Sequence, residues 1–154
     1  AHNIAKVEKH KVDGKERKLV VHRKGATRAF PSNRNEIPSK YRNLGQPVLV
    51  PGSMGTSSWI LLGQSNSMDL SFGSTAHGAG RTMSRSKARR NYTEDYVKKS
   101  LNDKGIFIKA LTRDGVVEET PEAYKDVDSV VNVSHNLGIA SKVAKLVPIG
   151  VIKG

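Results

Sequence analysis

The sequence has no cysteine and few aromatic residues. Phe, Trp and Tyr together make up 5% of its 154 residues. The lack of cysteine excludes disulfide bonds and thiolate zinc sites within this stretch. It also fits a reducing cytosol, so we expect a cytoplasmic protein. The scarcity of aromatic residues argues against nucleic-acid binding by base stacking, so phosphate contacts would have to dominate any such binding.

Long apolar runs are missing as well. No stretch approaches the roughly 20 apolar residues that a membrane span needs, and the mean hydropathy is −0.48. No signal-peptide pattern is visible. We therefore expect no membrane partner. The length is that of one domain, and 36% hydrophobic residues can supply its core.

Positive charge is in large excess, with 26 Lys and Arg against 14 Asp and Glu and a net charge of +12. Such an excess favours polyanionic partners, of which nucleic acid is the first candidate. A basic surface without such a partner explains the composition equally well. Two basic clusters are suited to backbone phosphates: His22, Arg23, Lys24 and Arg28, and Arg81, Arg85, Lys87, Arg89 and Arg90.

Turn signals and hydrophobic patterns predict several strands. One hairpin is expected over 7–21 around Asp13-Gly14, and a second over 106–118 around Asp114-Gly115. Further strands are expected at 47–50, 58–62 and 144–152, with a long irregular segment over 23–46.

Three helices are expected as well. They are predicted at about 80–91, from the cap Thr93 to about 103, and from a cap at Asp126 or Asp128 to Gly138. This order of hairpins and helices predicts an α+β fold rather than alternating βαβ units.

A loop of small residues surrounds His77, reading Gly-Ser-Thr-Ala-His-Gly-Ala-Gly-Arg over 73–81. Small neighbours let a phosphate approach the imidazole, and glycines allow backbone N–H groups to form an anion nest. The expected helix would point its positive end at that anion, with Arg81 and Arg85 on one face. A neutral imidazole is a competent nucleophile toward phosphorus. The pattern alone leaves phosphate chemistry and an incidental histidine both open.

A second loop of small residues, 51–58, follows the strand expected at 47–50. It holds four hydroxyl side chains and two glycines, but it lacks the lysine and the spacing of a P-loop. A phosphate cradle and a tight turn explain this loop equally well.

The other histidines give weaker signals. His10 stands between lysines and is expected to be an exposed strand residue. His135 would complement the dipole at a helix end. His22 either supports a phosphate site or has a structural role. His2 and Lys153 lie near the termini and would be dismissed alone, although the apolar tail before Lys153 would give that lysine a defined place.

Six segments together resemble the RtcB family of RNA ligases, the tRNA-splicing ligases. They occur in the family's order, end at its C-terminal Lys-Gly, and are more specific together than any single motif. The segments are 1–6, 21–31, 45–56, 73–81, 118–126 and 148–154.

The resemblance implies a GTP- and manganese-dependent ligase that acts in tRNA splicing and RNA repair. Such an enzyme joins an RNA 3′-phosphate, or a 2′,3′-cyclic phosphate after hydrolysis, to an RNA 5′-hydroxyl. By position, His77 would be the catalytic histidine that accepts GMP, and His2 a manganese ligand. The guanylate-binding residues would be Asn3, Pro51, Gly52, Ser53, Met54, Ser58, Gly78, Ala79, Gly80, Tyr124 and Lys153. RNA phosphates would contact Arg23, Lys24, Arg81 and Arg85.

The resemblance also implies that residues 1–154 are the C-terminal portion of a single larger catalytic domain whose N-terminal portion is absent. The family's other metal ligands, an Asp, a Cys and further His residues, belong to that portion. One imidazole cannot hold a catalytic manganese. We therefore expect this chain to need the missing portion as a partner and to be inactive alone. The physiological RNA and the need for an activating protein partner stay open.

A non-catalytic, basic RNA-binding module would also explain the charge. Such a module has no need of both His77 in its small-residue loop and Lys153. Their joint presence therefore favours the ligase over the binding module.

Overall fold

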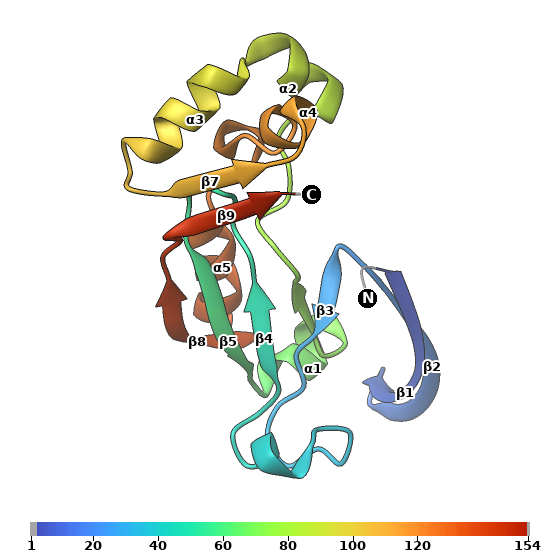
Figure 1. The fold of residues 1–154 in the computed structure, drawn as a ribbon. Coiled ribbons are helices and arrows are strands. Elements are labelled where there is room, and N and C mark those ends of the chain that lie inside the picture. Colours follow the sequence, from blue (N-terminus) through green and yellow to red (C-terminus); the bar gives the residue numbers. More distant parts are fainter. Residues whose placement is uncertain (1–2, 154) are drawn as a thin grey trace.

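The computed structural model describes residues 3–153. Strands and helices alternate irregularly along the chain, as expected for an α+β fold, and the described strands form four small sheets without a barrel. Figure 1 shows a central sheet with a helix behind it, a group of helices at one end, and a hairpin that curls away from the body.

The hairpin consists of β1 (Asn3–Val12) and β2 (Lys15–Lys24), which pair antiparallel along their whole length. Asp13 and Gly14 form the turn with φ of 51° and 77°. Two positive φ angles are typical of a type I′ turn, whose twist matches that of the strands. The predicted hairpin is therefore confirmed, and it is longer than expected.

The central sheet has the strand order β4 (Pro47–Val50), β5 (Ser58–Gly63), β8 (Ala140–Leu146). Helix α5 (Val127–Asn136) packs on it, and a core forms between Val48, Leu61 and Val131. Asp126 is the cap of α5, because its carboxylate accepts hydrogen bonds from the two following backbone N–H groups at 128 and 129. The strands at 47–50 and 58–62 and this helix are confirmed.

A second core joins helices to a pair of strands. Helices α2 (Arg85–Asn91), α3 (Glu94–Asn102) and α4 (Arg113–Val117) lie beside β7 (Phe107–Ala110) and β9 (Gly150–Lys153). Its buried members are Met54, Val97, Leu101, Ile106 and Val116. The helix capped by Thr93 is confirmed, since the Thr93 side chain accepts a hydrogen bond from the Tyr96 N–H.

The remaining elements connect the hairpin to the central sheet. Strand β3 (Ala26–Arg28) pairs antiparallel with β6 (Ser74–Ala76), and α1 (Asn66–Ser71) precedes β6. Single 3-10 turns occur at η1 (Ser39–Tyr41) and η2 (Pro121–Ala123). The sequence patterns missed β3, β6 and α1, which are all short.

The predicted second hairpin is wrong. Thr112 caps α4 by accepting a hydrogen bond from the Gly115 N–H, so the Asp114-Gly115 pair lies inside a helix. β7 instead pairs in parallel with β9, from Phe107 beside Gly150 to Ala110 beside Lys153. The strand expected over 144–152 is accordingly two strands, β8 and β9, separated at 147–149.

The predicted start of the helix at about 80 is also wrong. α2 begins at Arg85, because Ser84 is its cap and accepts a hydrogen bond from the Lys87 N–H. Arg81 lies before the helix and forms an isolated β-bridge with Tyr124. Arg81 and Arg85 therefore do not share a helix face.

His10 is buried, with 2% of its surface exposed, so its predicted exposure is wrong. Its ring meets Phe72 edge to face at 5.3 Å, and its Nε2 lies 3.0 Å from the Glu8 carboxylate. His135 lies in the last turn of α5, as expected, and its side chain is exposed. No helix among residues 3–153 is long and apolar enough to cross a membrane.

Candidate functional site

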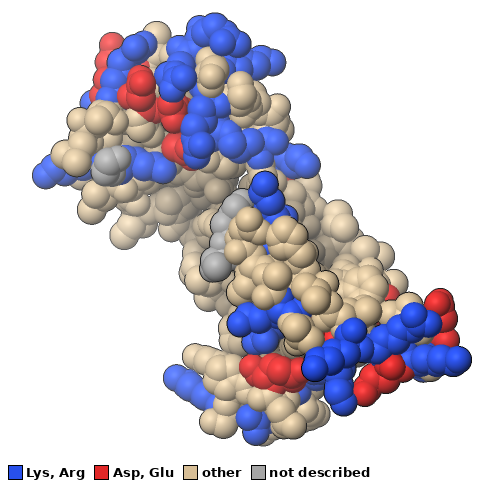
Figure 2. Space-filling model, turned by 90° about the vertical axis from the view of Figure 1, so that its right-hand side faces the viewer, with Lys and Arg blue, Asp and Glu red and all other residues tan. Residues whose placement is uncertain are grey.

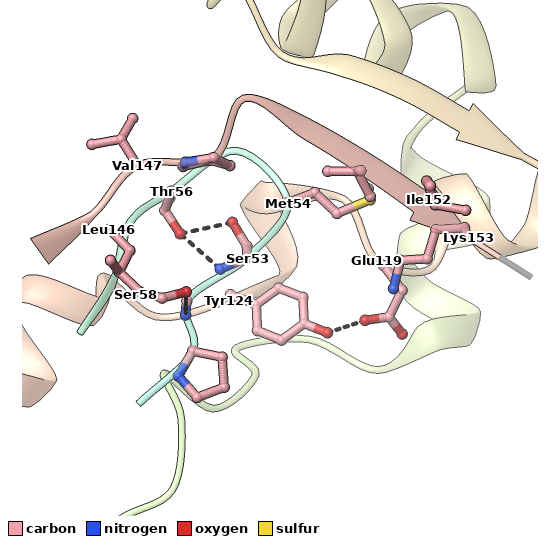
Figure 3. Close-up of a pocket in the computed structure, with 14 residues that line it drawn as sticks. Ser53, Met54, Thr56, Ser58, Glu119, Tyr124, Leu146, Val147, Ile152 and Lys153 are labelled. Carbon is pink, nitrogen blue, oxygen red and sulfur yellow. Dashed lines mark hydrogen bonds between the residues drawn. The ribbon is translucent and has the colours of Figure 1, made fainter. Parts of the chain in front are cut away.

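A cavity of about 400 Å³ lies between the loop 51–58, the segment 119–124 and strand β9 (Figure 3). Cavities of a few hundred Å³ are the usual size for small-molecule sites. Three segments far apart in the sequence meet here. The lining includes seven of the predicted guanylate-binding residues: Pro51, Gly52, Ser53, Met54, Ser58, Tyr124 and Lys153.

The loop 51–58 is a tight turn, and three of its four hydroxyl side chains line the cavity. Thr56 Oγ1 accepts a hydrogen bond from the Ser53 N–H at 2.7 Å and lies 2.9 Å from Ser53 Oγ. A Cβ atom at Gly52 would lie 2.1 Å from the Ser57 carbonyl oxygen, so only glycine fits there. The side chain of Met54 anchors the turn in the second core. The segment is thus a tight turn that also presents hydroxyl groups to a cavity. The two alternatives left open by the sequence, a tight turn and a phosphate cradle, therefore do not exclude each other.

Glu119 and Tyr124 form the polar wall of the cavity. The Tyr124 hydroxyl donates a hydrogen bond to Glu119 Oε2. Burial raises the pKa of the Glu119 carboxyl, but the Tyr124 hydrogen bond, the Lys153 charge and two arginines outweigh it and hold the pKa below its usual range. Burial and the same hydrogen bond raise the pKa of Tyr124. The wall therefore combines an ionised carboxylate, a neutral phenol and a nearby ammonium.

Arg81 joins this wall to the segment after His77. Its Nη1 donates to Tyr124 Oη at 3.1 Å, and its Nη2 donates to the Glu118 carbonyl at 2.6 Å. The guanidinium also lies over the Tyr124 ring, 4.9 Å from the centroid. The guanidinium is thus already bound to protein groups. Its contact with an RNA phosphate stays a prediction.

Arg85, the first residue of helix α2, reaches the carboxylates of Glu118 and Glu119. Its Nε lies 3.3 Å from Glu119 Oε1 and 3.4 Å from Glu118 Oε2, while 64% of its side chain is exposed. An exposed ion pair of this kind is worth little and exchanges readily for another anion. Arg85 is therefore accessible to a phosphate beside the cavity.

The His77 loop lies beside the cavity and follows β6 directly. The Ala79 N–H donates to the Pro51 carbonyl at 2.9 Å, and the Gly80 carbonyl accepts from the Lys125 N–H at 2.9 Å. The loop thus runs from the 51–58 turn to the residue after Tyr124. Of the predicted set, Gly78, Ala79 and Gly80 belong to this loop rather than to the lining. The next helix, α2, begins only at Arg85, so the predicted contribution of its dipole at this loop stays a prediction.

Arg23 is buried and bound to protein groups, which disfavours its predicted contact with an RNA phosphate. Only 2% of its surface is exposed. Its guanidinium makes two hydrogen bonds to the Glu8 carboxylate, at 2.7 and 2.9 Å, and further ones to Ser74 Oγ and the Phe72 carbonyl, each at 2.8 Å. Arg23 therefore fixes the hairpin to the β6 region. Its neighbour Lys24 is exposed at the end of β2.

Asn3 lies at the start of β1 and is not among the residues that line the cavity. A hydrogen bond joins its side-chain oxygen to His22 Nε2, which indicates a structural role for His22. Its predicted contact with guanylate is not tested by this arrangement. His2, the predicted manganese ligand, lies outside the described residues. Within residues 3–153, no three His, Cys, Asp or Glu side chains come together in a way that could hold a metal ion.

Comparison with known proteins decides the family. The family model described as "tRNA-splicing ligase RtcB" matches residues 1–154. The chain belongs to the RtcB family.

The relatives include proteins named tRNA-splicing ligase RtcB from three archaea. Over 154 residues the chain is 56% identical to that of Nanoarchaeum equitans, 55% to that of Thermococcus kodakarensis and 56% to that of Archaeoglobus fulgidus. Each match covers the whole of this chain and 32% of the relative. The chain thus spans about a third of the length of these RtcB relatives.

Some lining residues of this RtcB chain were not predicted as site residues. Glu119 was part of the segment 118–126 that carried the resemblance, and Thr56 ended the segment 45–56, so both were within reach of the sequence. Pro148, Val151 and Ile152 of the apolar wall belonged to the segment 148–154, but that they line a cavity depends on how β8 and β9 meet the 51–58 turn. The members of this wall are Leu146, Val147, Pro148, Val151 and Ile152.

Proposed function

We propose that the complete protein is a GTP- and manganese-dependent RNA ligase, and that this chain supplies its guanylate pocket and its nucleophile, His77. The ligase joins an RNA 3′-phosphate, or a 2′,3′-cyclic phosphate once hydrolysed, to an RNA 5′-hydroxyl. Ligation in tRNA splicing fits the names of the relatives.

Three displacements at phosphorus account for this reaction. A ring nitrogen of His77 attacks the α-phosphorus of GTP, forms an N–P bond and releases pyrophosphate. An oxygen of the RNA 3′-phosphate then attacks the same phosphorus, and the histidine leaves. The 5′-hydroxyl of the second RNA finally attacks the 3′-phosphate, loses its proton, and displaces GMP as a phosphodiester bond forms.

The observation that carries the proposal is the convergence in one cavity of seven residues assigned to guanylate binding from resemblance alone. The chemistry of the lining fits a guanylate. Serine hydroxyls and the backbone of the 51–58 turn can donate to a phosphate or ribose, and the Lys153 ammonium can donate to the base or to a phosphate. The Ala79–Pro51 hydrogen bond keeps the His77 loop against the turn that forms one side of the cavity.

Manganese does not fit the described residues by themselves. No suitable cluster of ligands occurs among residues 3–153. Bound Mn²⁺ would supply charge stabilisation at the phosphates, and it would need ligands beyond those residues. We therefore assign to this chain only binding of the guanylate, orientation of its phosphate, and attack by His77.

The test compares His77→Ala with His135→Ala in the complete protein that contains this chain. His135 is an exposed histidine at the end of α5 and lies outside the cavity. With α-labelled GTP and Mn²⁺, His77→Ala is expected to lose both covalent GMP and ligation while RNA binding persists. His135→Ala is expected to keep all three. Survival of labelling in His77→Ala would exclude His77 as the nucleophile, and binding of RNA without labelling or ligation in the unsubstituted complete protein would favour the RNA-binding module.

A second test uses the 154-residue chain alone. Incubated with labelled GTP and Mn²⁺, it is expected to remain unlabelled, because the described residues do not form a metal site. Strong labelling at His77 would contradict the expected need for the rest of the domain.

A further inference from the structure

Strands β7 and β9 form a parallel pair with two unlike faces. Ile108, Ala110 and Val151 lie on one face and pack against the second core. Because side chains alternate along a strand, Phe107 and Ile152 belong to the opposite face. Phe107 is 68% exposed and Ile152 85% exposed. The pair thus has one face packed on the second core and one solvent-exposed face, on which Phe107 and Ile152 are apolar and Lys109, opposite Ile152, is charged.

Further exposed apolar residues extend this surface. Leu111 follows β7 and is 82% exposed, and Ile149 precedes β9 and is 86% exposed. We call Phe107, Leu111, Ile149 and Ile152 the β7–β9 surface. In Figure 1 the pair lies unobstructed in front of the helices. Exposed apolar surface beyond scattered single residues marks interaction sites on soluble proteins.

The strand geometry itself calls for a cover. Parallel sheets occur almost only with both faces buried, and two strands alone are marginally stable in water. Among the described strands, β7 pairs only with β9, and β9 only with β7. Each strand therefore also has a free edge that can accept backbone hydrogen bonds from another strand.

We propose that the β7–β9 surface is where the remainder of the RtcB sequence docks. The match with this chain covers 32% of each of the three relatives, so about two thirds of such a protein lies outside the matched segment. That portion is the occupant of the surface, covering its apolar face or continuing its sheet at a free edge. A second copy of this chain is the competing occupant.

Docking there also completes the cavity. Ile152 lines the cavity as well as belonging to the docking surface, and Lys153 follows it on the face toward the second core. A cover on β9 would close the cavity on that side and hold Lys153 near Glu119, whose pKa its charge lowers. This step rests on the proposed guanylate site, whereas the docking itself does not.

The experiment co-expresses this chain, tagged, with the untagged portion of the Nanoarchaeum equitans relative that lies outside the match. Purification omits GTP, Mn²⁺ and RNA, so failure of the ligase proposal cannot affect the result. We expect a 1:1 complex by size-exclusion chromatography with light scattering. Phe107→Glu and Ile152→Glu are each expected to weaken it about tenfold or more, because a charge would be buried in the interface.

Leu44→Glu is the matched control, since Leu44 is 58% exposed in the loop before β4. It is expected to leave the complex unchanged. Hydrogen exchange on the unsubstituted chain checks the surface without any variant, and amides at 107–111 and 149–152 are expected to slow about tenfold in the complex.

Three results would overturn the docking proposal. They are failure of the two parts to associate, a complex that is insensitive to both glutamate variants with unchanged exchange at β7 and β9, and a homodimer of this chain that buries the same surface and excludes the added portion.

Discussion

The side chains of Arg81 and Tyr124 make two contacts with each other. Arg81 Nη1 donates a hydrogen bond of 3.1 Å to Tyr124 Oη, and the guanidinium lies over the ring, 4.9 Å from its centroid. They are also partners in an isolated β-bridge. Arg81 follows the His77 loop, and Tyr124 lines the cavity. The position of the proposed nucleophile is thus linked to the wall of the pocket through one pair of side chains.

Tyr124→Phe separates the two contacts of this pair. The ring remains under Arg81, but the hydroxyl that connects Arg81 to Glu119 is lost. The hydroxyl bonds two charged partners, and a hydrogen bond to a charged group is worth about 1.5 to 3 kcal/mol, so guanylate attachment in the complete protein is expected to fall about tenfold or more. Tyr124→Leu removes the ring as well and is expected to reduce attachment by a further factor of about five. Initial rates of GMP labelling measure both effects. Equal rates for Phe and Leu would show that the ring contributes nothing.

Removal of Glu8 tests the structural role assigned to Arg23. Glu8→Leu leaves the Arg23 guanidinium buried without its carboxylate, which costs about 3 to 5 kcal/mol of unfolding free energy. The double variant Glu8→Leu/Arg23→Met is expected to recover a large part of that loss, because no charge stays unpaired. Urea unfolding measures these differences. Lys24→Gln, an exposed neighbour, is the control and is expected to change stability by less than about 0.5 kcal/mol.

The same carboxylates predict acid sensitivity. Burial raises the pKa of Glu8, but hydrogen bonds from Arg23 and His10 and their charges bring it below the ordinary value of 4.5. The pKa of Glu119 is likewise below 4.5. A folded-state pKa below the unfolded one gives stability that is present above pH 4.5 and is lost as the pH falls from there through the folded-state pKa.

The urea midpoint is therefore expected to be nearly constant at neutral pH and to drop below about pH 4.5. Glu8→Gln should make that drop smaller, since it removes one of the carboxyl groups whose pKa is lowered in the folded state. A midpoint that rises on acidification would contradict the assignment of these carboxylates as ionised and paired.

The sequence predicted local features well where one residue sets the geometry. The Asp13-Gly14 turn and the Thr93 cap act through their own side chains and backbone, and both were found. Asp114-Gly115 has the same turn signature, yet the Thr112 cap and the packing of Val116 and Val117 against the helices make a helix there. Tertiary packing, which a local pattern does not contain, therefore decided whether the Asp-Gly pair forms a hairpin turn or lies in a helix.

Burial of charged residues was the other part that the sequence could not provide. His10 and Arg23 stand in basic stretches, where exposure is the normal expectation. Both are buried because Glu8, on the paired strand or two residues away, satisfies them. The pocket residues were found from family resemblance, while the arrangement that brings Lys153 beside Glu119 depends on the parallel pairing of β9 with β7.

Gly52→Ala tests the shape of the 51–58 turn. An added Cβ would lie 2.1 Å from the Ser57 carbonyl oxygen and 2.5 Å from Thr56 Oγ1, so the turn would have to move. We expect a loss of more than tenfold in guanylate attachment, with about 1 to 3 kcal/mol lost in unfolding free energy. Gly14→Ala is the control for a strained turn outside the cavity, and it is expected to affect stability but not attachment. Full labelling in Gly52→Ala would exclude the turn from the guanylate site.

Arg85 and Lys24 remain exposed and available to RNA phosphates. Lys and Arg gather over the helical end of the molecule and along the hairpin in Figure 2. Each phosphate contact releases a counterion, so loss of one lowers affinity and reduces the slope of log K against log salt by about 0.7 to 1. Arg85→Gln and Lys24→Gln in the complete protein are each expected to show both effects. Fluorescence anisotropy with a 3′-phosphorylated RNA at several salt concentrations measures them.

Lys40→Gln provides the comparison for general charge loss. Lys40 is an exposed cation in η1, outside both basic clusters. Its substitution by Gln removes the same unit of charge. If Lys40→Gln reduced the salt slope as much as Arg85→Gln, RNA would be responding to net charge rather than to a defined phosphate position. An unchanged slope in Lys40→Gln, with reduced slopes in the other two variants, would instead indicate two defined phosphate positions. One would lie at Arg85, beside Glu119 of the cavity wall, and the other at Lys24, at the end of β2 in the hairpin.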